Sequence, residues 1–190
     1  MAFFSRHDLA IVSDALSIAE DATSDFYKFS FRQWKRHCYD VKTRSSLSSD
    51  EISSFALAVL TRAVREVDEF SSKTKTREFY FICLQDHIIL EVLKRDRHLA
   101  LLPLLVYIFT HELVHIVRFC DFSQRYELSE AARAEEESLV HAKAFDILKT
   151  CSLPKLDHVL ASYNEHRQSP MAFGQVSFIK EDSRYADLRV

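Results

Sequence analysis

The sequence is poor in the two residues that most often interrupt regular structure. Its 190 residues include one glycine and three prolines. Glycine and proline build tight turns and end helices, so their scarcity favours long helices and argues against a fold made of many short turns. Hydrophobic residues make up 47% of the chain, enough for a sizeable core. This length and composition predict one domain, or one domain with an appendage.

The cysteines lack the spacing of a metal-binding or redox motif. Cys38, Cys83, Cys120 and Cys151 are scattered and form no Cys-x-x-Cys pair, which argues against a sulfur-ligand zinc site. The first residues carry charges and lack the apolar centre of a signal peptide. We therefore expect a cytoplasmic protein with reduced thiols. The net charge is −3 with acids and bases mixed, which does not indicate a nucleic-acid surface.

One long apolar run extends from Leu99 to Phe119. Its uncharged part covers only residues 99–110, and polar side chains interrupt it from His111 onward. Crossing a bilayer takes about 20 apolar residues. The run therefore predicts a buried core helix rather than a membrane span.

An HExxH motif, formed by His111, Glu112 and His115, lies within this run. Residues four apart share one face of an α-helix, so both imidazoles can reach one metal ion. Glu112 can lie beside the same ion and act on a water molecule. Two histidine ligands with a neighbouring carboxylate base are typical of a hydrolytic zinc site.

A third protein ligand is needed, and the acidic cluster Glu135-Glu136-Glu137 follows downstream. A metzincin is not favoured, because no glycine or third histidine follows His115 at the required spacing. The sequence resembles the gluzincin metallopeptidases, and its small size resembles the compact minigluzincins. In that family a second helix about 20 residues downstream supplies a glutamate ligand. His115 and Glu137 are 22 residues apart.

The resemblance favours Glu137 as the third ligand, with Glu136 in reserve. With Glu137 as the ligand, His141 stands where the family usually has an aspartate that orients a ligand. His141 can take that orienting role, or it can be a fourth metal ligand that closes the site. Alternatively, the cluster is a solvated acidic first turn of a helix with no role in metal binding.

The resemblance also implies an activity, in which one Zn²⁺ ion activates a water molecule and Glu112 is the general base. The substrate would be a peptide or protein. Gluzincins use a histidine or tyrosine from a later helix to stabilise the transition state. The candidates for that role are His158, Tyr163 and His166, and they remain unranked.

The fold expected is α+β and mostly α, zincin-like, with a small hairpin packed on the HExxH helix and a following helix that carries Glu137. We expect one domain over residues 1–167, with N-terminal helices in 1–75, the hairpin and metal-site helices in 76–167, and a tail over 168–190.

Helices are predicted at about 7–37, 50–70, 99–120, 129–150 and 154–167, with a polar loop over 39–49. The second of these helices, at about 50–70, is predicted to begin at a capping box formed by Ser48 and Glu51. The hairpin is predicted from the runs Phe79–Leu84 and His87–Leu93.

Two other classes of protein remain open. Glu112 and His115 also form a Glu-x-x-His motif of the kind found in di-iron carboxylate bundles. The second copy required there is imperfect, because Ser138 precedes His141 at that spacing. The other alternative is a helical interaction module with structural histidines. The sequence leaves the substrate and the oligomeric state open.

Overall fold

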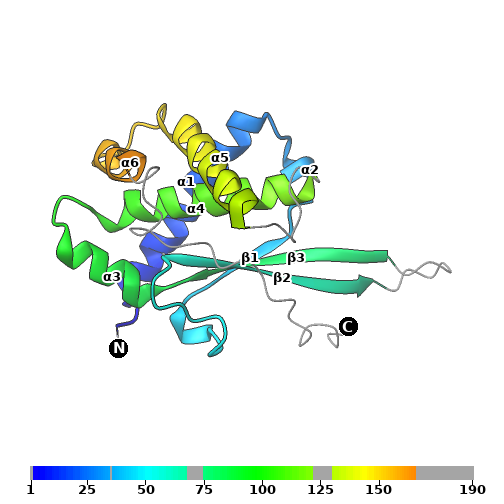
Figure 1. The fold of residues 1–190 in the computed structure, drawn as a ribbon, viewed down its shortest axis with the longest axis horizontal. Helices are drawn as coiled ribbons and strands as arrows, with labels where there is room; N and C mark the ends of the chain where they lie inside the picture. Colours follow the sequence, from blue (N-terminus) through cyan, green and yellow to red (C-terminus); the bar gives the residue numbers. More distant parts are fainter. Residues whose placement is uncertain (1, 35, 68–74, 122–129, 166–190) are drawn as a thin grey trace.

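The computed structural model describes residues 2–34, 36–67, 75–121 and 130–165. It shows a mixed α+β fold that is mostly helical and has a small sheet, which confirms the predicted class at that level (Figure 1). The elements are α1 (Arg6–Tyr27), α2 (Phe31–Trp34), β1 (Tyr39–Lys42), η1 (Arg44–Ser46), β2 (Ala58–Val67), β3 (Lys75–Leu84), α3 (Asp86–Arg95), α4 (Leu101–Cys120), α5 (Glu130–Leu148) and α6 (Leu156–Glu165).

The three strands of the sheet lie in the order β1-β3-β2. β3 pairs in parallel with β1 and antiparallel with β2. Side chains on a strand alternate between the two faces. Accordingly, Tyr80, Ile82 and Leu84 enter the main core and are fully buried, whereas Phe81 and Cys83 lie in a small second cluster. The face of the sheet that the helices cover therefore carries the larger hydrophobic cluster, which is the main core.

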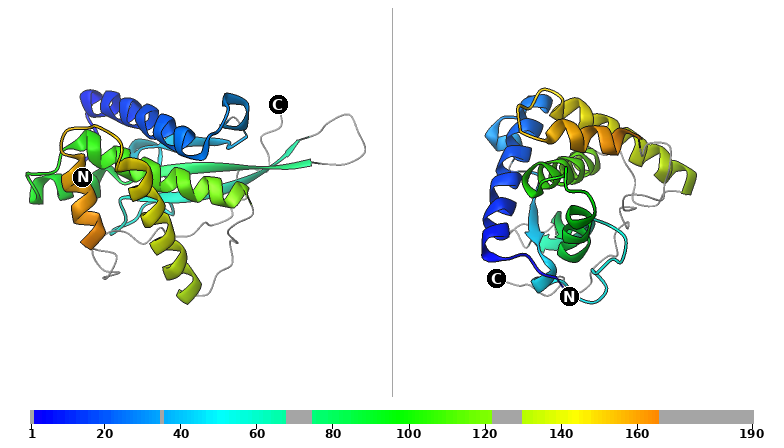
Figure 2. Two further views of the ribbon diagram at one scale, coloured as in Figure 1. Left: turned by 90° about the horizontal axis from the view of Figure 1, so that it is seen from above. Right: turned by 90° about the vertical axis from the view of Figure 1, so that its left-hand side faces the viewer.

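Helix α4 is the central helix of the fold. It packs against α1, α5, α6 and β3, and Figure 2 shows neighbouring helices on more than one side of it. Residues from Pro103 to Val117 are all buried. Within the described residues, α4 is the one helix long and apolar enough to cross a membrane, and most of it is buried inside the fold. A helix that is apolar nearly all round is expected to be enclosed by others, as α4 is here.

Helix α1 begins and ends at recognisable capping residues. The Ser5 hydroxyl accepts a hydrogen bond from the Asp8 backbone N–H, and the Asp8 carboxylate accepts one from the Ser5 N–H. This reciprocal capping box fixes the start of the helix. Lys28 has a left-handed backbone with φ of 58°, and its N–H bonds to the Ser24 carbonyl. The long helix predicted to about residue 37 therefore ends ten residues early and is followed by α2.

The second predicted helix, over residues 50–70, is wrong over residues 50–67, and residues 68–70 lie outside the described part of the chain. The expected contact between Ser48 and Glu51 is present, because the Ser48 backbone N–H donates to Glu51 Oε2 at 2.8 Å. It stabilises a turn, however, and the chain continues into strand β2. The loop predicted over 39–49 is also wrong in part, because it contains β1 and η1. The N-terminal region expected to be helical thus supplies two of the three strands.

The predicted hairpin is also wrong in its second half. Residues Phe79–Leu84 do lie in β3, but His87–Leu93 lie in helix α3. The buried residues of α3 are spaced by three, at Asp86, Ile89 and Val92, which is the period of a helix face. The antiparallel partner of β3 is β2. Helices α4, α5 and α6 agree with the predicted helices, and the predicted tail over 168–190 lies outside the described residues.

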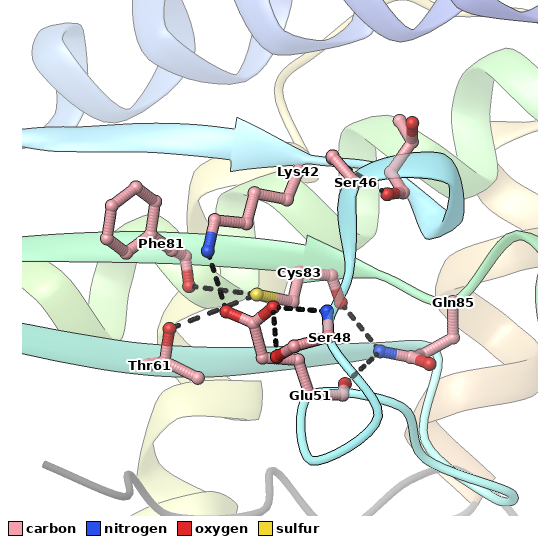
Figure 3. Close-up of polar contacts among 9 residues, drawn as sticks. Lys42, Ser46, Ser48, Glu51, Thr61, Phe81, Cys83 and Gln85 are labelled. Carbon is pink, nitrogen blue, oxygen red and sulfur yellow. Dashed lines mark hydrogen bonds and ion pairs between the residues drawn. The ribbon is translucent and has the colours of Figure 1, made fainter. Parts of the chain in front are cut away.

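The face of the sheet opposite the helices carries a polar group that we call the outer-face cluster: Lys42, Ser48, Glu51, Cys83 and Gln85 (Figure 3). The Lys42 Nζ atom lies 2.7 Å from Glu51 Oε1. The other carboxylate oxygen of Glu51 accepts bonds from the backbone and the hydroxyl of Ser48. The Gln85 amide donates to the Glu51 and Cys83 carbonyls at 3.0 and 3.1 Å. Hydrogen bonds thus fasten the β1–β2 connection to the end of β3.

Asp86, at the start of α3, joins two distant parts of the chain. Its carboxylate accepts hydrogen bonds from the backbone N–H groups of Phe4 and Arg44, both at 3.0 Å. Asp86 is 1% exposed, and its bond to Phe4 is buried while that to Arg44 is partly buried. They hold the segment before α1 and the segment after β1 against the same helix.

Candidate metal centre

Helix α4 places the three motif residues together inside the protein. His111, Glu112 and His115 are 5%, 3% and 0% exposed. The Nε2 atoms of the two histidines lie 3.2 Å apart, as expected for residues one helical turn apart on the same face. A buried polar group needs partners. At this distance the two imidazole nitrogens can share a hydrogen bond, and both are also close enough to contact one ion.

Helix α5 brings Glu137 to the two histidines. Its Oε2 atom lies 3.3 Å from His111 Nε2, and its Oε1 atom lies 3.3 Å from His115 Nε2. Tetrahedral zinc with bonds of about 2.0–2.1 Å holds its ligand atoms about 3.3–3.4 Å apart. Each carboxylate oxygen of Glu137 lies at about this distance from one of the two histidine nitrogens, so the three side chains are close enough to share a single zinc ion.

The other two glutamates of the acidic cluster are engaged elsewhere or exposed. Glu136, the reserve candidate, forms an ion pair with Arg118 of α4, including an Nη2–Oε2 contact of 2.9 Å. Glu135 is exposed. The choice of Glu137 over Glu136 as a ligand stays a prediction, but of these three residues the structure places Glu137 at both histidines.

The pKa values of the two carboxyl groups in the candidate centre are shifted in opposite directions. Burial raises the pKa of Glu112, and the neighbouring His111 and His115 offset part of that rise. For Glu137, burial also opposes ionisation, but contacts with His115 and His111 outweigh it and hold its pKa well below the usual range. Glu112 Oε2 has no hydrogen-bond partner among the described residues, although it is buried. An unsatisfied buried carboxylate oxygen marks a place where a further group is expected.

His141 and two tyrosines extend the candidate centre. The Tyr107 hydroxyl lies 2.6 Å from His141 Nδ1, and the rings of His111 and His141 are 4.4 Å apart. Tyr163 of α6 packs its buried ring on Tyr107 at 4.4 Å. Sequence reasoning missed Tyr107 as a site residue. The available signal was its position four residues before His111, on the same face of α4.

His158 is placed differently from the prediction. Its Nε2 atom lies 3.0 Å from the Asp96 carboxylate at the end of α3, and its ring contacts that of His98. The sequence made His158 a candidate for the transition-state role, but its described contacts are with Asp96 and His98 rather than with His111, His115 or Glu137. His166, the remaining candidate, lies outside the described residues.

Comparisons with family models, with curated proteins and with solved structures found no match. The resemblance to gluzincins consequently rests on the motif, its spacing and the geometry of the candidate centre.

Proposed function

We propose that this protein is a zinc-dependent metallopeptidase of the gluzincin type with a zincin-like fold. The observation that carries the proposal is the spacing of 3.2–3.3 Å among the donor atoms of His111, His115 and Glu137. These residues would hold one zinc ion through a His₂Glu set, which is a known ligand set of catalytic zinc. When bound, the zinc supplies Lewis acidity that activates a water molecule and polarises a carbonyl.

Glu112 performs the proton transfers in this proposal. It follows His111 directly, and its buried Oε2 atom lacks a described hydrogen-bond partner. It accepts the proton of the attacking water and then passes it to the leaving amine. His111, Glu112 and His115 are each at most 5% exposed, and limited contact with bulk water favours such transfers.

The sheet supports a peptide as the substrate class. β2 is an edge strand of the described sheet. Edge strands can bind an extended peptide by adding it as a further strand. The gluzincin resemblance implies this mode, because in that family an edge strand beside the metal site binds the substrate backbone in this way.

The metal content of the purified full-length protein tests the proposal. We expect about one zinc ion per chain, lost in His111→Ala and Glu137→Gln. Glu136→Gln is the matched control, because it makes the same change one residue earlier, at the glutamate paired with Arg118. Its zinc content should equal that of the unmodified protein.

Other outcomes assign other classes. Two irons per chain would indicate a di-iron carboxylate protein. No metal after zinc addition, with a melting temperature insensitive to chelator, would indicate a helical module with structural histidines. Either result contradicts the proposed peptidase.

A further inference from the structure

The turn of α5 that carries Glu137 lies before the part of the helix that packs in the core. Among the described side chains of α5, the buried ones are Val140, Ala144, Ile147 and Leu148, all in its second half. Glu137 precedes the first of them by three residues and contacts the two histidines of α4. Apolar packing therefore fixes the helix beyond this glutamate rather than the turn that bears it.

An ion pair between Arg118 and Glu136 gives that turn a second link to α4. Arg118 follows His115 by three residues, and Glu136 directly precedes Glu137. The guanidinium donates from Nε to one carboxylate oxygen and from Nη2 to the other, the latter at 2.9 Å. The two side chains are only 15% and 11% exposed. A two-point contact between a planar guanidinium and a carboxylate fixes direction as well as distance.

The two links join the same helices at neighbouring positions of each. A rotation or shift of α5 that withdrew Glu137 from the histidines would also pull Glu136 away from Arg118. The ion pair therefore opposes the movement that would take the carboxylate of Glu137 out of the site. A ligand that is already held in place loses less conformational freedom when the ion binds, which favours binding.

We propose that Arg118 is a positioning residue of the metal site, which acts through Glu136 to hold Glu137 at both histidines before the ion binds. Arg118 itself is no ligand, because a guanidinium stays protonated and only donates hydrogen bonds. The inference rests on the proposed function, since it concerns the same zinc ion. It adds a residue outside the HExxH motif and the acidic cluster to the machinery that binds the metal.

The zinc Kd of the full-length protein, measured by competition with a coloured chelator, tests the inference. Arg118→Gln should raise the Kd about 10-fold, the lower end of the effect found for residues that orient metal ligands. The direction of the change is diagnostic. Removal of a positive charge near a cation site would by Coulomb's law alone tighten zinc binding. Weaker binding therefore reports lost positioning, whereas an unchanged or lower Kd would overturn the inference.

Three further variants serve as controls. Arg62→Gln makes the same change at another partly buried arginine, but its partner Glu78 lies on β3, so the zinc Kd should not change. Arg118→Lys keeps the charge and loses the two-point contact, and it should give an intermediate Kd. Glu136→Gln keeps an oxygen that can accept a hydrogen bond from Arg118, so its zinc content in excess zinc should stay complete.

The melting temperature of the metal-free protein separates positioning from a merely structural role. If Arg118 only stabilises the packing of α4 and α5, Arg118→Gln lowers this temperature but leaves the Kd of the folded protein unchanged, which contradicts the inference. If Arg118→Gln is unfolded at the temperature of the assay, Arg118→Lys decides by the same Kd measurement.

Failure of the inference differs from failure of the proposed function. If the unmodified protein binds no zinc, the proposed function fails and the inference fails with it. If it binds zinc and His111→Ala abolishes binding, but Arg118→Gln binds as tightly as the unmodified protein, the inference alone is overturned.

Discussion

Two carboxylates, Glu51 and Glu112, are both buried, but their surroundings differ. Glu51 is 5% exposed, and Lys42 and Ser48 contact both its oxygens. Glu112 is 3% exposed, and its Oε2 has no hydrogen-bond partner among the described residues. The ionised form of Glu51 is stabilised, since contacts with Lys42 and Ser48 outweigh the effect of burial and lower its pKa. Burial instead raises the pKa of Glu112. The contacts of Glu51 stabilise the fold, whereas the unpartnered Oε2 of Glu112 is consistent with the proton-transfer role proposed above.

The largest effect is expected from Glu112→Gln, which keeps the shape of the side chain but removes its basicity. Cleavage of a peptide library should slow by about 10²–10⁴-fold, the usual contribution of a general base. Zinc content and melting temperature should not fall, because no described hydrogen bond to Oε2 is lost. Mass spectrometry of the products measures the rate. Full activity with metal bound would refute the role of Glu112.

The matched change in the outer-face cluster, Glu51→Gln, should affect stability and leave metal binding unchanged. It removes the charge that contacts Lys42 at 2.7 Å. Hydrogen bonds to charged groups contribute about 1.5–3 kcal/mol each, so the free energy of unfolding should fall by about 2–3 kcal/mol. Urea denaturation at pH 7 measures this change. A loss of zinc in this variant would contradict the separation of the two regions.

The pH dependence of that stability difference follows from the lowered pKa of Glu51. A carboxyl group whose pKa is lower in the folded state adds stability above its unfolded pKa and loses it as the pH falls through the folded pKa. The ordinary value is 4.5. The gap in unfolding free energy between the unmodified protein and Glu51→Gln should therefore be constant near neutral pH and shrink below about pH 4.5. Urea titrations at several pH values measure it, and a gap that widened in acid would be incompatible with this electrostatic role.

The smallest effect is expected at the edge of the outer-face cluster, from Thr61→Val. The Thr61 hydroxyl has a long contact of 3.9 Å with Cys83 Sγ. Burial is the main reason that the pKa of Cys83 rises to about 12, so the thiol stays protonated and neutral. Replacing one partner of so weak a contact should change the unfolding free energy by less than about 0.5 kcal/mol. Thermal denaturation tests this, and a loss comparable to that of Glu51→Gln would show that the cluster depends on more than its charged pair.

The helices of the candidate centre were predictable because their signals are local. His111 and His115 lie one turn apart in one helix, and the apolar flanks of α4 indicate its burial. The spacing that the gluzincin resemblance implies led to the prediction of Glu137, which lies 3.3 Å from both histidines. The contact of Tyr107 with His141 could not be predicted in the same way. It depends on how α4 and α5 cross, and a single sequence does not encode that crossing in a local pattern.

The strands were harder to predict because pairing decides them. The hydrogen bonds between Ser48 and Glu51 serve a turn here as well as they would serve a helix end. β2 is a strand because β3 lies beside it, from the Ala58–Leu84 pair onward. Short apolar runs such as His87–Leu93 fit a strand or a helix equally well. In α3 the burial of Ile89 and Val92 settles that ambiguity in favour of a helix.

The parallel pairing of β1 with β3 has a consequence for the order in which the chain folds. Tyr39 is aligned with Tyr80, and Phe4 is bonded to Asp86, so the N-terminal part depends on partners far along the sequence. Contacts between distant residues form slowly, because a large loop must close first. The segment before α1 and strand β1 leave the ribosome before β3 and α3, so they must wait for these later elements before docking. Segments that are synthesised earlier thus reach their final place after segments that are synthesised later.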